Sequence, residues 1–189
     1  MRTGTPPTTR ASLARLAVAA SIALAAMAAH ALDGFPGAKA VAFDGKRLQQ
    51  AAQGGTPVET WREFVPQGEP IARWTRLASI REYPTHADPM VLATGLLRAL
   101  RQQNPDAPSS IIRNPSTGEV IVDFITWPSD RSFTEFNLFR YGRREGGGVV
   151  AQQYALRHYG DATEFLRGLK AERTRLVELM AKEGLKAAP

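Results

Sequence analysis

Five polar residues that fall on three neighbouring predicted strands are the first candidates for a functional site. Asp123 interrupts an apolar strand, and Glu135 and Asn137 share one face of the strand that follows. Gln153 and Arg157 belong to the last predicted strand. Polar groups gathered among aromatic side chains are what a ligand-binding groove requires. A simpler alternative stays open, in which these residues face water or form cross-strand pairs.

The two carboxylates, Asp123 and Glu135, would support acid–base chemistry if they faced one another. Paired carboxylates about 5–10 Å apart are the catalytic groups of glycosidases. The sequence therefore offers a second hypothesis, a carboxylate-dependent hydrolase that acts in the cell envelope. This hypothesis requires both side chains on the same face of the sheet, and opposite faces would contradict it.

Other catalytic signatures are missing from the sequence. It contains no cysteine, which excludes thiolate catalysis, disulfides and thiolate metal sites. His86 and His158 each lack a histidine at helical spacing and a close acidic pair, so polar structural roles are favoured over a metal site. The glycines at 146–148 lack the Lys-Ser/Thr of a phosphate-binding loop. We therefore expect no catalytic residue, no metal ligand and no cofactor.

Three tryptophans are the remaining candidates for recognition. Trp61, Trp74 and Trp127 are large amphipathic groups that either fill a core or offer a surface for stacking. A core role is the commoner one. The aromatic signatures of RNA-binding modules are absent, and we expect no nucleic-acid partner.

Residues 1–31 have the three parts of a secretory signal peptide. Three arginines precede an apolar run at residues 16–27, and a small-residue A-x-A site ends at Ala31. The run is shorter than the roughly 20 residues of a bilayer span. We predict cleavage after Ala31, a periplasmic or secreted location, and no membrane anchor after cleavage. Without those three arginines the 24 basic residues fall to 21, against 18 acidic ones. This small net positive charge is not typical of a nucleic-acid-binding protein.

The remaining chain has the length of one domain. Residues 32–57 are rich in Gly and Ala and form a weakly patterned N-terminal segment, in which Phe35, Val41 and Phe43 could add a short strand or cover an edge. A single α+β domain is predicted over 58–184. Runs of β-type residues are bounded by Pro, Gly and Asn turn signals. These patterns predict strands at residues 58–65, 71–83, 110–113, 119–127, 133–141 and 149–158. The apolar residues at 74, 77 and 80 also fit a helix, and a strand is preferred because the strand at 58–65 needs a partner.

Two segments have helical periodicity. The first is predicted over residues 89–103, because Asp88 can accept the free N–H groups of the first turn and Pro89 loses no hydrogen bond there. The second is predicted to open at Asp161, with Glu164 completing a capping box.

Short turns between consecutive strands require antiparallel pairing and exclude a doubly wound parallel sheet. The predicted fold class is α+β, with a single antiparallel sheet of about five to six strands and two main helices packed on it.

The stretch W-R-E-F-V-P-Q-G-E at residues 61–69, followed by Trp74, resembles an E-F-V-P-x-G-E…W pattern in uncharacterised exported proteobacterial proteins. The order of elements is also similar to that of the Mog1/PsbP-like fold. Members of that fold group act mostly as accessory or binding subunits, so the resemblance implies binding and brings no catalytic residues. An NTF2-like ligand cup is a third hypothesis, but that fold usually begins with helices.

Taken together, the sequence predicts a small exported α+β protein. Its predicted role is non-catalytic binding of a protein partner or a small-molecule ligand in the cell envelope.

Overall fold

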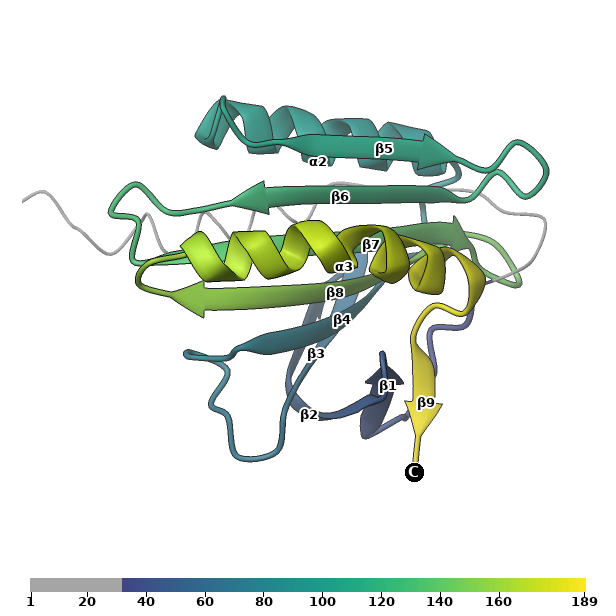
Figure 1. Cartoon of the computed structure of the whole chain (residues 1–189). Coiled ribbons are helices and arrows are strands. Elements are labelled where there is room, and N and C mark those ends of the chain that lie inside the picture. Colours follow the sequence, from purple (N-terminus) through teal and green to yellow (C-terminus); the bar gives the residue numbers. More distant parts are fainter. Residues whose placement is uncertain (1–31) are drawn as a thin grey trace, which may run out of the picture.

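The computed structural model describes residues 32–189, which form one large antiparallel sheet and two helices (Figure 1). The sheet has nine strands in the order β5-β6-β7-β8-β4-β3-β2-β1-β9. The strands are β1 (Ala40–Phe43), β2 (Lys46–Thr56), β3 (Glu59–Val65), β4 (Arg76–Tyr83), β5 (Ser109–Arg113), β6 (Val120–Thr126), β7 (Phe133–Arg143), β8 (Val149–Tyr159) and β9 (Lys186–Ala188). The helices are α2 (Pro89–Gln103) and α3 (Thr163–Lys182).

The expected sheet of five to six strands is wrong, because it leaves out β2 and β9 and counts a short strand around Val41 and Phe43, the observed β1, only as an option. β2 is mostly exposed and carries glutamine, alanine and glycine, so it lacks the alternation of apolar and polar residues that marks a half-buried strand. Its pairing is set instead by the two-residue turn at Asp44 and Gly45, both at positive φ, which joins β1 to β2. An Asp-Gly turn is a strong hairpin signal and would have revealed both strands.

The weakly patterned segment at 32–57 supplies β1 and β2 to the same sheet as the rest of the chain. The proposed signal peptide at residues 1–31 lies outside the described residues. Within residues 32–189, no helix combines the length and the hydropathy that a membrane span requires.

Helix α2 begins and ends as the sequence predicts. The Asp88 carboxylate accepts a hydrogen bond from the backbone N–H of Met90 at 2.8 Å, and Pro89 is the first helical residue. The helix ends at Gln103, where Asn104 caps it. Its buried residues pack on one face of β5, β6 and β7, which we call the α2 face of the sheet.

Helix α3 begins one residue later than the predicted cap at Asp161 implies. Asp161 accepts hydrogen bonds from the N–H and hydroxyl of Thr163, but the cap residue is Ala162, which offers no side-chain oxygen. The helix buries Leu169, Leu176 and Met180 against the opposite face of the sheet, the α3 face.

The sheet curls strongly around α3 (Figure 1). Phe43 on β1 and Tyr154 on β8 are four strand spacings apart in the sheet order, which in a flat sheet would separate them by about 19 Å. Their ring centroids are only 4.6 Å apart. The first strands of the chain therefore fold over the α3 face and close the apolar core between the sheet and α3, which we call the main core. The α2 face lies on the outer side of this curl.

Candidate functional site

Four of the five predicted site residues meet on the α2 face and form one chain of hydrogen bonds. The Gln153 side-chain amide donates to Asn137 Oδ1 at 2.8 Å, and the Asn137 amide donates to Glu135 Oε2 at 3.4 Å. Arg157 Nε donates to Glu135 Oε1 at 2.7 Å. This arrangement follows from the register of β7 and β8, which places Glu135 directly opposite Arg157.

Aromatic side chains surround the end of this chain at Arg157. The Arg157 guanidinium carbon lies 3.9 Å from the ring centroid of Trp74 and 4.2 Å from that of Phe133. Arg73, which is exposed, lies 4.4 Å from the ring centroid of Tyr159. We call these five residues, Arg73, Trp74, Phe133, Arg157 and Tyr159, the aromatic–arginine patch.

Hydrogen bonds fix the patch to the segment that precedes β4. Arg157 Nη1 donates to the Tyr159 hydroxyl at 3.3 Å, and that hydroxyl donates to the backbone carbonyl of Trp74 at 3.2 Å. Glu135 neutralises Arg157, while Arg73 has no carboxylate partner among the described residues. Trp74 is buried, Phe133, Arg157 and Tyr159 are half-buried, and Arg73 is exposed. The patch is therefore a preorganised cluster of rings and guanidinium groups that reaches the surface chiefly through Arg73, with a surplus of positive charge.

The fifth predicted site residue, Asp123, lies on the opposite face of the sheet. It stands opposite Leu138 on β7, and its carboxylate accepts two hydrogen bonds of 2.7 Å from Arg173 of α3. Glu135 stands opposite Thr126, an odd number of residues from Asp123, so the two carboxylates point to different faces. The structure therefore does not bring together the pair that the hydrolase hypothesis requires.

A second polar cluster lies nearby on the α2 face, and sequence reasoning missed it. Arg81 of β4 donates to Glu59 at 3.1 Å and to Glu63 at 3.3 Å, both from β3. Its position follows from the register, which pairs Arg81 with Trp61, midway between the two glutamates. We call Glu59, Glu63 and Arg81 the buried carboxylate–arginine cluster; it holds two acids and one base.

Four buried side-chain atoms of the described chain have no hydrogen-bond partner, and they lie in or beside this cluster. They are Ser79 Oγ, Arg81 Nε, His86 Nδ1 and Tyr141 Oη. Ser79, Arg81 and Tyr141 all point to the α2 face, and His86 packs edge-on against Tyr83. Buried polar atoms without partners are uncommon and are often satisfied by ordered water.

Burial raises the pKa of Glu63, and the nearby Arg81 charge opposes the rise only in part. A carboxyl whose pKa is higher in the folded than in the unfolded state stabilises the fold most at low pH, and that stabilisation is lost as the pH rises past its ordinary value of 4.5. We therefore expect Glu63→Gln to raise the free energy of unfolding at pH 7 by up to about 1 kcal/mol. Urea unfolding at several pH values should show the gain disappear below pH 4.5. An equal gain at all pH values would contradict the assignment.

The histidines and the other tryptophans have structural contacts. His158 points to the α3 face and stacks on Phe165 of α3 with ring centroids 5.6 Å apart. Trp61 lies over Gly54 so closely that a Cβ there would sit 2.6 Å from its ring. Trp127 is half-buried with Arg131 5.7 Å from its ring. Of the three tryptophans, Trp74 alone joins the predicted polar residues.

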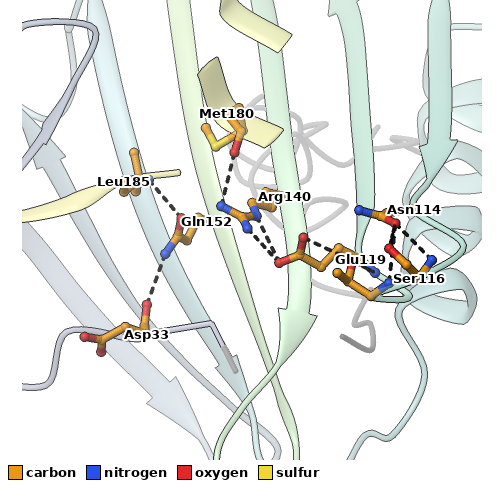
Figure 2. Close-up of polar contacts among 9 residues, drawn as sticks. Asp33, Asn114, Ser116, Glu119, Arg140, Gln152, Met180 and Leu185 are labelled. Carbon is orange, nitrogen blue, oxygen red and sulfur yellow. Dashed lines mark hydrogen bonds and ion pairs between the residues drawn. The ribbon is translucent and has the colours of Figure 1, made fainter. Parts of the chain in front are cut away.

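A polar network on the α3 face ties both ends of the described chain to the sheet (Figure 2). The Gln152 side-chain amide donates to the carbonyl of Asp33 at 3.1 Å, and its oxygen accepts from the N–H of Leu185 at 2.9 Å. Arg140 binds Glu119 at 2.7 Å and also reaches the carbonyl of Met180 at the end of α3. Every polar group in this network has a partner, so its role is structural.

Two surface clefts of the described chain are lined by no residue of the aromatic–arginine patch, although the second reaches Thr75, next to Trp74. One of about 290 Å³ lies between the β1–β2 turn and the C-terminal end of α3, and another of about 400 Å³ lies between β2 and the start of β4. Among residues 32–189, no group of three or more histidine, aspartate or glutamate side chains is placed to hold a metal ion.

These features define the class of protein first: residues 32–189 form one nine-stranded antiparallel sheet with two helices, and a network of paired polar side chains lies on its α2 face. A family model matches residues 36–185, and the chain belongs to that family, whose function is uncharacterised. The match confirms neither the E-F-V-P-x-G-E…W pattern nor the Mog1/PsbP-like similarity. A search of curated proteins found no relative.

Proposed function

We propose that this protein is exported to the periplasm and binds another protein there, without catalysis, through the aromatic–arginine patch. The observation that carries this proposal is the contact of the Arg157 guanidinium with the rings of Trp74 and Phe133, while Glu135 holds it in place. Arginine, tryptophan and tyrosine are the residues most enriched at the energetic centres of protein interfaces.

The shape and charge of the patch favour a protein partner over a small molecule. Small-molecule sites are concave, and neither of the two clefts is lined by a residue of the patch. Its exposed cation, Arg73, favours a partner surface that offers a carboxylate beside apolar groups. Rigid rings and a guanidinium already held in place lose little conformational entropy on binding.

Export is proposed from the sequence of residues 1–31, with cleavage after Ala31. The hydrolase alternative has no comparable support, because Asp123 and Glu135 point to different faces and each is held by its own arginine.

The first experiment is native mass spectrometry of the protein purified gently from the envelope fraction of its own cells. We expect the mass of residues 32–189 plus the mass of a partner protein. Arg73→Glu reverses the exposed cation and should weaken the complex about 30-fold, which corresponds to about 2 kcal/mol at an energetic centre. The matched control is Arg98→Glu on the exposed side of α2, which makes the same charge change away from the patch.

Loss of the partner mass in Arg73→Glu but not in Arg98→Glu would support the proposal. Equal loss in both variants, or retention in both, would place the binding site elsewhere. A protein that carries no partner at all, and retains residues 1–31, would overturn both export and binding.

A further inference from the structure

Strand β5 forms one edge of the sheet, and its outer side carries backbone groups that the sheet does not use (Figure 1). Hydrogen bonds join Asn114 to Glu119 and Ile125 to Pro108. In an antiparallel pair the residues bonded to the neighbouring strand alternate with residues whose N–H and C=O point away. The amides of Ser109, Ile111 and Arg113 therefore point away from β6, towards the open edge.

The side chains of this edge are unusually apolar for an exposed strand. Ile111 is 37% exposed and Ile112 is 50% exposed. Edge strands are commonly protected by inward-pointing charges, lysines or bulges, and β5 has a regular register with β6 and none of these devices. Pro108 and Pro115, which have no N–H, stand just outside the strand and limit the ladder that another strand could form.

The charges around β5 favour an antiparallel neighbour. Within three residues of the strand, Asp106 precedes it and Arg113 ends it, and there is no other charge. Antiparallel pairing of two identical strands would bring Arg113 of one copy to the end of the other copy that carries Asp106. Parallel pairing would place the two Arg113 side chains together, which is unfavourable.

We propose that two copies of this chain pair through β5 in a symmetric antiparallel dimer. The register that uses all the outward amides places Ile111 opposite itself on the two-fold axis, and Ser109 opposite Arg113. This contact is self-complementary, because each copy uses the same strand. It pairs the free side of β5 in both copies, so no third copy can bind through β5. It joins the two sheets into one continuous sheet and does not involve the aromatic–arginine patch.

Engineered cysteines test the register directly, because the native chain has none. In Ile111→Cys the two cysteines would have Cα atoms about 5.5 Å apart, within the range of about 4.4–6.8 Å for a disulfide. In the matched control, Ile112→Cys, the two cysteines are diagonal neighbours about 7–8 Å apart and should not be bridged. We expect mild oxidation of the purified protein to cross-link the first variant and not the second.

Charge reversal tests the same contact in solution. Arg113→Glu should weaken the dimer at least about tenfold, because it places an acid at the end of the other copy that carries Asp106, and Asp106→Arg should do the same with two bases at that end. The double variant, which exchanges the two charges, should restore the affinity of the dimer. If either single variant acted only by damaging the fold, combining the two would not restore dimerisation. Lys170→Glu on α3 is the control for net charge. Analytical ultracentrifugation over a range of concentrations measures each dissociation constant, and circular dichroism checks the fold.

A protein that stays monomeric at all concentrations and cross-links in neither cysteine variant would overturn the dimer. Equal cross-linking of both cysteine variants, or a double charge variant no better than the single ones, would also overturn the register. A strand of another protein on this edge would show as a heterogeneous complex without the Ile111 cross-link. None of these outcomes bears on the patch variant Arg73→Glu, so the two proposals are tested separately.

Discussion

Replacing Glu59 with glutamine is expected to lower the free energy of unfolding by about 3 kcal/mol or more. The side chains of Glu59 and Arg81 are only 4% and 3% exposed, and they are joined at 3.1 Å. The substitution leaves the buried Arg81 with Glu63 alone, which is more distant at 3.3 Å and more exposed. Removing one partner of a buried ion pair is costly because the remaining charge stays desolvated. Urea unfolding at pH 7 measures the loss.

Two variants show whether the loss comes from the unpaired charge. Glu63→Gln removes the other acid from the same arginine and is expected to be neutral or stabilising, as derived above from the raised pKa of Glu63. Glu59→Gln combined with Arg81→Met removes both charges and should recover most of the stability. If Glu59→Gln costs no more than Glu63→Gln, the buried pair is not what stabilises this part of the sheet.

Replacing Phe43 with alanine is the second change expected to have a large effect, a loss of about 3–5 kcal/mol. Phe43 is 3% exposed and packs on Tyr154 across the curl of the sheet. Its removal leaves a cavity where β1 meets the main core, because neither the β1–β2 hairpin nor α3 can move in to fill it without breaking the β1–β9 pairing. Thermal and urea unfolding measure the loss. Val58→Ala, at a side chain 52% exposed, is the matched control and should change stability by less than about 0.5 kcal/mol.

Strands and helices with strong local signals could be predicted from the sequence. The helix at 89–103 is confirmed, because an aspartate cap, a proline start and an Asn-Pro stop all act locally. The strand predicted at 71–83 begins only at Arg76, because the segment before it is a turn that brings Trp74 onto the sheet. β2 could not be found by periodicity, since tertiary pairing with β3, rather than burial of one face, keeps it extended.

The candidate site was predictable only as far as strand alternation allows. Glu135 and Asn137 share a face because they are two residues apart on one strand, and the β7–β8 turn brings Gln153 and Arg157 beside them. The face of the sheet on which Asp123 lies, relative to Glu135, depends on the register of the β6–β7 hairpin. A shift of one residue in that register would move Asp123 to the other face. Arg81 was missed because its partners come from β3, and nothing local to β4 signals a buried charge.

The pairing of β1 with β9 places Ala40 opposite Ala188, so the two ends of the described chain are neighbours in space. Contacts between residues so far apart in sequence carry a large entropy cost of loop closure and form slowly. β1 gains its second neighbour in the sheet from β9, which follows α3 in the chain. The sheet is thus expected to stay open at β1 during most of folding, and the pairing of β1 with β9 is expected to close it in a late step.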